Sequence, residues 1–296
     1  MNNKIFLLGV GFNNLKKEEV LELIIKGLEK NDKKYYVVTP NPEILVIANS
    51  DSNYKKVLNS AKLALPDGIG VMLASKLLSK PFKERIQGVD LVESLCREVS
   101  KRPITVGFLG AGPHVAETAA ECLREKYPGL NIVFTAEEWD WEADGQTHDA
   151  QDPRRSFPQS SKLPRSLNEI RPKKSMVDKN GGKPSFGSFA NSLSLGKMEN
   201  GKRKTENKID ILFVAFGSPK QEIWTSENLE KLPVKVAIGV GGSFDFISKK
   251  VPRAPRFLRD LGLEWLFRLI IQPWRIKRQL RLLKFIYLVI KEKLTK

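Results

Sequence analysis

The sequence is poor in the residues that build metal centres and disulfide frameworks. Its 296 residues include two cysteines, Cys96 and Cys122, and two histidines, His114 and His148. Two cysteines cannot form a disulfide framework, and no Cys-x-x-Cys motif or Cys/His cluster indicates a zinc site. We therefore expect a reducing, cytoplasmic setting and no metal site.

Long hydrophobic runs are also missing. The segment MNNKIFLLGVGFNN contains an apolar run of about six residues, which Gly9 and Gly11 interrupt, so no signal peptide is predicted. No stretch approaches the roughly 18 apolar residues that a membrane-spanning helix needs. Hydrophobic residues still make up 41% of the chain, which is enough for a buried core and excludes wholesale disorder.

Acidic residues are too few to balance the basic ones. Lys and Arg number 50 against 34 Asp and Glu, which gives a formal net charge of +16. Residues 249–296 alone hold 14 Lys and Arg against 3 Asp and Glu, a net charge of +11. Such a concentration suggests binding to nucleic acid, to an anionic membrane or to a phosphorylated substrate.

The pattern of apolar residues predicts an α/β fold. Short β-rich runs alternate with amphipathic or capped helices, which favours a Rossmann-like, mainly parallel sheet flanked by helices. The predicted strands are 5–10, 35–39, 103–109, 131–135, 209–217 and 234–242. The predicted helices are 16–30, 44–49, 69–78, 88–100, 114–127 and 218–231, followed by 255–271 and 273–295. We expect a core over 1–250 and a basic amphipathic helical appendage over 251–296.

One segment breaks this alternation. Within 151–205, Ser, Gly, Pro, Lys and Arg make up 32 of 55 residues, and the hydrophobic residues follow no period. Such a composition cannot bury enough surface to offset the entropy of ordering, so we predict a long disordered insertion over about 137–206. Asp140 and Glu142 form a D-x-E in this segment, but we expect no metal site there.

A glycine motif follows the predicted strand 103–109. In G-A-G-P-H-V-A, Gly110 and Gly112 fit the G-x-G-x-x-A form that lets the backbone approach a phosphate at a helix N-terminus. A nucleotide-binding role and a plain tight turn between strand and helix both remain open.

Two polar side chains at predicted turns could each serve either a functional or a capping role. Asp67 in LPDGIG is a candidate general base, and the local pattern alone favours an N-cap for helix 69–78. Asn41 in TPNPE is either a ligand contact or a helix cap.

Further candidates lie at Arg85 and in the segment GSPKQE. Arg85 could clamp a diphosphate with its planar fork, or it could be solvated or paired with Asp90. Lys220 or Gln221 could reach a ligand from the end of a strand, and the alternative is ordinary capping by Ser218.

The predicted last helix contains regularly spaced arginines. Arg275, Arg278 and Arg281 share one face at i, i+3 spacing, and Arg268 precedes them by one heptad. They form either a phosphate-binding and membrane-facing surface or a solvated basic face. The interleaved apolar residues are mostly aliphatic, which suits lipid better than stacking on nucleic-acid bases.

Seven motifs occur in a fixed order and together resemble one protein family. They are VVTPNPE (37–43), LPDGIGV (65–71), RIQGVDL (85–91), FVAFGSPKQE (213–222), GVGGSFDF (239–246), RAP (253–255) and GLEWLFRL (262–269). This set closely resembles the WecG/TagA/CpsF family of bacterial glycosyltransferases. The resemblance covers about 1–135 and 208–285.

The resemblance implies an activity and its substrates. It implies inverting, metal-independent transfer of N-acetylmannosamine, with no cofactor, from its UDP donor to an N-acetylglucosaminyl diphosphate on undecaprenyl lipid. The product would be the β-1,4-linked lipid-bound disaccharide of wall teichoic acid or a related polymer. It also implies a cytoplasmic enzyme that is peripheral on the inner face of the membrane, with anionic lipid as partner. The amphipathic tail leaves self-association into a homo-oligomer open.

The resemblance also gives roles to matching residues. Asp67 corresponds to the general base, and Arg85 to a phosphate ligand. The remaining substrate-binding positions implied are Thr39, Asn41, Gln221, Arg268, Arg275 and Arg278. The appendage is implied to close the active site and to touch the membrane, while the family's shorter link contrasts with the segment 137–206.

Two other functions compete with this one. An NAD(P)-linked oxidoreductase would use 110–116, with Glu137 or Glu138 as the ribose partner. A basic nucleic-acid-binding protein would show salt-dependent binding to DNA of any sequence.

Overall fold

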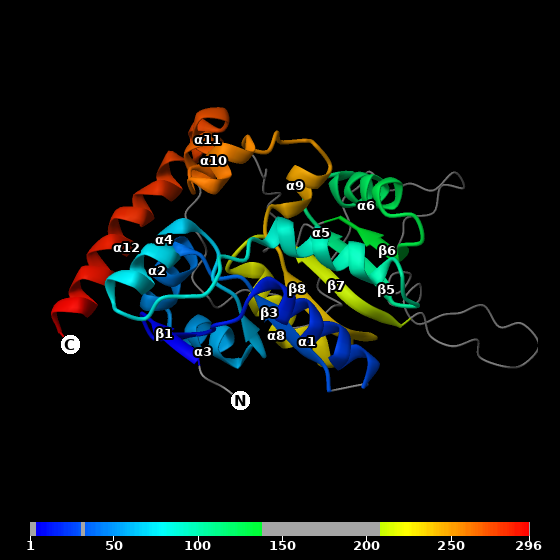
Figure 1. Cartoon of the computed structure of the whole chain (residues 1–296), viewed down its shortest axis with the longest axis horizontal. Helices are drawn as coiled ribbons and strands as arrows, with labels where there is room; N and C mark the ends of the chain where they lie inside the picture. Colours follow the sequence, from blue (N-terminus) through cyan, green and yellow to red (C-terminus); the bar gives the residue numbers. More distant parts are fainter. Residues whose placement is uncertain (1–3, 31–32, 138–207, 296) are drawn as a thin grey trace, which may run out of the picture.

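A parallel six-stranded sheet forms the centre of the molecule (Figure 1). The computed structural model describes residues 4–30, 33–137 and 208–295, except for the side chains of residues 277 and 278. The strand order is β4-β3-β8-β7-β5-β6, and every neighbouring pair is parallel. The strands are β3 (Tyr35–Val38), β4 (Leu63–Ala64), β5 (Thr105–Gly110), β6 (Asn131–Ala136), β7 (Ile209–Ala215) and β8 (Val234–Gly239). The predicted α/β class is confirmed.

The two parts of the chain on either side of 138–207 build this one sheet together. β7 pairs with β5, and β8 lies between β7 and β3. Alternate residues of β7 lie in opposite hydrophobic cores. Ile211 and Phe213 are buried in the core on one face of the sheet, and Leu212 and Val214 are buried in the core on the other face. A parallel sheet covered on both faces needs such continuous apolar strands.

Helices cover both faces. One core contains apolar residues from α1 (Lys17–Glu29), α5 (Gly88–Val99), α6 (Val115–Lys126) and α9 (Ser243–Ile247). The opposite core contains residues from α2 (Pro42–Ser50), α3 (Ser52–Ser60), α4 (Ile69–Leu77), α8 (Lys220–Asn228) and α12 (Ile276–Leu294). A short 3-10 helix, η2 (Leu229–Lys231), follows α8.

The prediction of one strand over 5–10 was wrong. The segment is a hairpin of β1 (Lys4–Leu7) and β2 (Val10–Asn13), which pair antiparallel outside the main sheet. Leu8 and Gly9 form the two-residue turn, both with positive φ. Two left-handed residues suit such a turn, and its position inside one short β-rich run concealed it.

The appendage contains more breaks than predicted. Instead of one helix over 255–271, the chain forms α10 (Arg256–Asp260) and α11 (Glu264–Ile271), and η3 (Pro273–Arg275) precedes α12. The break follows from Gly262, whose φ is +75° and whose added Cβ would lie 2.7 Å from the side chain of Ile69. The chain thus turns in a left-handed conformation where it touches the start of α4.

α12 docks along the core (Figure 1). Its inward residues Phe285 and Val289 are buried in the cluster that contains α2, and the carboxylate of Glu292 accepts a hydrogen bond from the backbone N–H of Leu8 at 2.9 Å. None of the helices in the described ranges combines the length and apolarity needed to cross a membrane.

Candidate active site at the carboxyl edge of the sheet

The predicted site residues of the core gather where the parallel strands end. Thr39 follows β3, Asp67 follows β4, Gly110 ends β5, Gln221 follows β7, and the turn 240–243 follows β8. Because all the strands are parallel, these segments lie along one edge of the sheet. Open α/β sheets bind ligands at this edge.

Thr39 and Asn41 shape the loop between β3 and α2. Thr39 is buried, and its hydroxyl donates to the carbonyl of Gly239 at 3.2 Å, which joins the ends of β3 and β8. The side chain of Asn41 accepts from the backbone N–H of Ile44 at 3.1 Å and caps α2. The capping interpretation of Asn41 is therefore confirmed.

Asp67 does not cap the helix that follows it. The N-cap of α4 is Gly68, which makes no side-chain capping bond. The loop is fixed by backbone bonds, since the N–H of Asp67 donates to the carbonyl of Pro40 at 3.1 Å. The backbone N–H groups of Gly68 and Gly88 lower the pKa of the carboxyl group. The capping interpretation of Asp67 is therefore wrong, and its role as a general base stays a prediction.

Opposing effects set the acidity of Asp67. Although the residue is half-buried, desolvation of its carboxyl group dominates and raises the pKa to about 7. The positive charge of Arg85 lowers that pKa, and the negative charge of Glu264 raises it. A carboxyl group with a pKa near neutrality suits proton transfer, because it can both take up and release a proton under cellular conditions.

Arg85 is neither freely solvated nor paired with Asp90. Its Nη2 donates to the backbone carbonyl of Arg259 at 2.9 Å and lies 3.4 Å from Oε1 of Gln87. Asp90 pairs with Arg253 instead, at 2.6 Å. The appendage thus supplies a contact to the arginine that stands beside Asp67.

Gln221 is 2% exposed, and both of its polar atoms are engaged. Oε1 accepts from the backbone N–H of Gly241 at 3.0 Å, and Nε2 donates to Glu222 at 2.8 Å. Glu222 is buried as well, and it accepts from the hydroxyls of Tyr54 (3.0 Å) and Ser218 (2.7 Å). Gln221 therefore braces the turn after β8, and Ser218 hydrogen-bonds within this cluster while Pro219 occupies the N-cap of α8.

The glycine motif lies between β5 and α6, as predicted. A Cβ on Gly110 would come within 2.9 Å of the backbone of Ala215, so close packing alone requires glycine there. Gly112 has the ammonium of Lys250 beside it. Both the tight-turn and the nucleotide interpretation fit this geometry.

Among the described residues, one group at this end of the sheet has ligand atoms close enough to hold a metal ion. His114, Glu117 and Glu137 place one ligand atom each within 4.8 Å of one another. Glu137 accepts from the backbone N–H of His114 at 2.7 Å, and the imidazole is exposed. Asp140 and Glu142, where we predicted that no metal binds, lie outside the described residues.

The arginines of the appendage come from three different elements. Arg268 on α11 donates to Asp245 at 3.2 Å and lies over the ring of Phe246, at the turn after β8. Arg268 and Arg275 both donate to Oε1 of Gln272 at 3.1 Å, so these two cations lie side by side. Arg278 is part of α12, and its side chain lies outside the described part of the chain.

Several residues at this edge escaped the sequence interpretation. Glu264 and Arg253 belong to the motifs GLEWLFRL and RAP, but neither was singled out. The available signal was a single acidic residue between two apolar segments of a strongly basic tail. Glu222 was missed too, because nothing local shows that it is buried.

A family model of glycosyltransferases matches this chain. The WecG/TagA/CpsF model covers residues 5–157 and 201–296, and it leaves 158–200 unmatched inside the predicted insertion. It gives no support to the oxidoreductase or nucleic-acid hypotheses.

The names of similar proteins agree with the match to this family. A Bacillus spizizenii protein named N-acetylglucosaminyldiphosphoundecaprenol N-acetyl-beta-D-mannosaminyltransferase is 33% identical over 89% of this chain and 81% of its own length. Proteins of the same name from Bacillus subtilis (strain 168) and Staphylococcus aureus (strain MRSA252) are 31% and 27% identical. These matches cover 93% and 98% of this chain, and 88% and 93% of the relatives. The chain therefore belongs to the WecG/TagA/CpsF family of glycosyltransferases.

Proposed function

We propose that this enzyme transfers N-acetylmannosamine from UDP-N-acetylmannosamine to N-acetylglucosaminyl-diphospho-undecaprenol. The product is the β-1,4-linked disaccharide on the lipid, an intermediate of wall teichoic acid or a related polymer. The names of the relatives supply the substrates. The observation that carries the mechanism is the half-buried carboxyl group of Asp67 beside Arg85 at the carboxyl edge of the sheet.

The reaction is a single displacement with inversion. The acceptor hydroxyl oxygen attacks the anomeric carbon of the sugar, the bond from that carbon to UDP breaks, and the proton passes to Asp67. A base with a pKa near 7 is ionised in part at neutral pH and can accept this proton. Thr39 and Asn41 hold the loop that contacts Asp67, and Gln221 braces the turn after β8 on the other side.

Cationic and backbone groups are available for the diphosphates. Departure of UDP places negative charge on the leaving group, and arginine stabilises such charge with paired N–H donors. Arg268 and Arg275 lie together beside the turn after β8, and Arg85 lies beside Asp67. We propose that these residues and Arg278 neutralise the diphosphates, that the loop with Gly110 and Gly112 approaches the nucleotide, and that neither metal nor cofactor is required.

The direct test is a turnover assay on the full chain. We expect UDP release and a lipid-linked disaccharide, identified by mass spectrometry, from UDP-N-acetylmannosamine and a short-chain acceptor analogue. UDP-N-acetylglucosamine as donor tests the sugar, and chelation by EDTA tests the metal requirement. Absence of transfer from every UDP-sugar would contradict the proposal, and loss of turnover in EDTA would contradict its metal-independence. A second chain without residues 158–200 shows whether the unmatched segment is needed.

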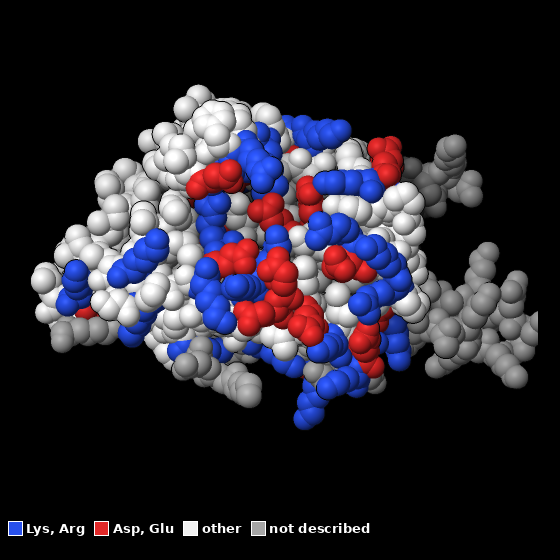
Figure 2. Space-filling view, in the orientation of Figure 1, with Lys and Arg blue, Asp and Glu red and all other residues white. Residues whose placement is uncertain are grey.

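The outward face of the appendage supports a membrane surface as partner. It exposes large apolar side chains beside lysines and arginines, and Figure 2 shows a mostly uncharged surface over α11 and α12. These apolar residues include Leu266, Ile270, Trp274, Leu280, Leu283, Ile286, Tyr287 and Ile290. An apolar face with basic neighbours lies well in the interface of anionic lipids. We propose that the enzyme sits at the inner face of the cell membrane, where its lipid acceptor is found.

Co-sedimentation with phosphatidylglycerol vesicles tests this face. Because Phe285 and Val289 belong to the core, removing the appendage would expose apolar surface, so outward substitutions are preferable. We expect Leu280→Gln with Leu283→Gln to reduce binding at least several-fold. The matched control is Leu23→Gln, an exposed leucine on α1. If the double variant binds vesicles normally but sediments as a smaller species in lipid-free buffer, the face serves self-association instead.

A further inference from the structure

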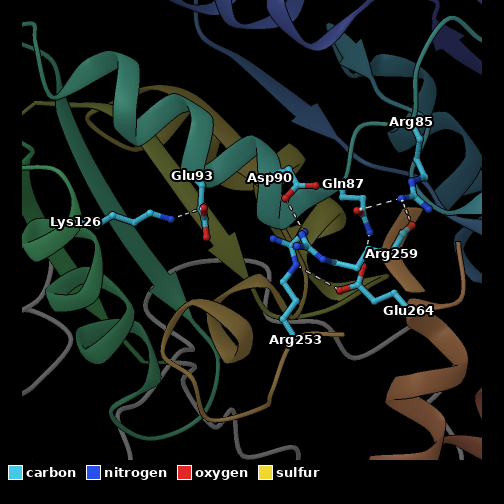
Figure 3. A network of polar contacts seen from close by, with 8 residues as sticks. All are labelled: Arg85, Gln87, Asp90, Glu93, Lys126, Arg253, Arg259 and Glu264. Carbon is cyan, nitrogen blue, oxygen red and sulfur yellow. Dashed lines mark hydrogen bonds and ion pairs between the residues drawn. The ribbon is translucent and has the colours of Figure 1, made fainter. Parts of the chain in front are cut away.

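A polar network joins the appendage to the start of α5 (Figure 3). Gln87, the N-cap of α5, donates from Nε2 to Glu264 at 2.5 Å. Arg253 lies between two carboxylates, with Nη2 2.6 Å from Asp90 and Nε 3.5 Å from Glu264. The side chains of Glu264 and Arg253 are only 14% and 19% exposed. Charges this far from water are retained when they are paired, so the contacts fix both side chains.

The network continues to Arg85. One guanidinium nitrogen of Arg85 is shared between Oε1 of Gln87 and the carbonyl of Arg259, so one acceptor comes from the core and one from the appendage. Figure 3 shows Arg85, Gln87 and Glu264 arranged in that order, with the side chains directed toward one another. The positive charge of Arg85 in turn lowers the pKa of Asp67.

The amide of Gln87 gives the network a direction. A glutamine side chain carries an acceptor on one side and donors on the other. Glu264, when ionised, only accepts, so it binds the Nε2 side of Gln87 and turns Oε1 toward Arg85. Without that carboxylate the amide is free to turn over, and its NH2 group would then face the guanidinium.

We infer that Glu264 is a positioning residue, which orients Gln87 and through it holds Arg85 beside Asp67 when the appendage is docked. The inference rests on the proposed role of Asp67 as the base. Gly262 supports the docking, since its turn packs against Ile69 two residues beyond Asp67. Glu264 also acts by its charge, because its negative charge raises the pKa of the Asp67 carboxyl while the positive charge of Arg85 lowers it, and the backbone N–H groups of Gly68 and Gly88 lower it too.

The variant Glu264→Gln separates this role from a purely structural one. In the unchanged enzyme, kcat/KM rises with pH through about 7 as Asp67 loses its proton. We expect Glu264→Gln to lower kcat/KM by about 10- to 100-fold, because Arg85 is misplaced. We also expect the midpoint of the pH profile to lie at lower pH than in a variant that displaces Arg85 but keeps this carboxylate, because the negative charge that raises the pKa of Asp67 is gone.

A second variant separates orientation from charge. Gln87→Met removes the link but leaves Glu264 charged and paired with Arg253, so kcat/KM falls similarly, and the midpoint moves to higher pH because the displaced Arg85 no longer lowers the pKa of Asp67. The matched control is Asp260→Asn on α10, where the carboxylate is exposed and makes only a long ion pair with Arg256; rate and midpoint stay unchanged.

The outcomes distinguish this inference from the proposed function. No turnover in the unchanged enzyme contradicts the function, whereas normal rate and midpoint in Glu264→Gln, with Asp67→Asn inactive, contradict the inference alone. A ¹³C NMR titration of the Asp67 carboxyl, assigned with Asp67→Asn, gives the midpoint without turnover. A midpoint there in Glu264→Gln that equals the midpoint in Gln87→Met would overturn the role of its charge.

Discussion

Two carboxyl groups near the carboxyl edge of the sheet, those of Glu222 and Asp67, lie in different surroundings. Glu222 is 1% exposed, and neutral donors from Tyr54, Ser218 and Gln221 surround it. Asp67 is half-buried and meets charged groups, Arg85 and Glu264. In both groups desolvation is the main cause of a raised pKa.

The comparison shows that a raised pKa does not by itself mark a catalytic group. The region of Glu222 is closed, and its hydrogen bonds tie α3 to α8. The region of Asp67 is assembled from loops and from the appendage, and part of the residue remains accessible to a ligand. Access and opposing charges distinguish the reactive site from the structural one.

The largest expected difference between the two regions is in activity. Removing the base in Asp67→Asn should lower kcat/KM by about 10²- to 10⁴-fold, the usual contribution of a general base. Glu222→Gln should lower it by less than about tenfold, because Glu222 reaches the site only through Gln221. Both are measured by UDP release, with circular dichroism as the control for folding. Equal losses in the two variants would remove the distinction between these carboxyl groups.

The next effect concerns stability and belongs to the closed region. Tyr54→Phe deletes the hydroxyl that donates to Glu222 and leaves a buried carboxylate oxygen without that partner. We expect the free energy of unfolding to fall by about 1–3 kcal/mol, measured by urea denaturation. Tyr287→Phe, at an exposed tyrosine of α12, is the matched control and should change stability by less than about 0.5 kcal/mol. A loss no larger than that of the control would show that Glu222 does not depend on this bond.

Much of the fold was predictable because it follows from local patterns of apolar and polar residues. The alternation of apolar runs and amphipathic segments predicted the parallel sheet, and the helix over 16–30 appears as α1 (Lys17–Glu29). The hairpin at Leu8 and Gly9 was not predictable in this way, since its turn lies inside one short β-rich run and Leu8 is itself apolar. The strand β4 was missed because it contains only two residues, Leu63 and Ala64.

The site was predictable as a set of positions, but its contacts were not. The motifs identified Asp67 and Arg85, yet local sequence alone favoured a helix cap for Asp67. Arg85 finds its partner at the carbonyl of Arg259, which is 174 positions away along the chain. Such contacts depend on how the appendage docks, and neither periodicity nor capping rules describe that docking.

The smallest expected effect is a gain in stability, and its pH dependence tests whether Asp67 is strained by burial. The folded pKa of about 7 lies above the ordinary value of 3.8, so between these pH values the folded protein retains a proton that the unfolded chain has lost. The free energy of unfolding contributed by Asp67 therefore falls as pH rises through this window.

Asp67→Asn removes that penalty. The gain in stability of this variant over the parent should therefore be larger at pH 8 than at pH 4.5. At about 1.4 kcal/mol per pKa unit the ceiling is about 4 kcal/mol, and relaxation around the charge reduces the expected gain to about 1–2 kcal/mol. Urea denaturation at the two pH values measures it, with the exposed Asp260→Asn as a control expected to stay within about 0.5 kcal/mol. A variant that is less stable than the parent at pH 8 would mean that the ionised Asp67 stabilises the fold, and the contrast with Glu222 would then lie in access alone.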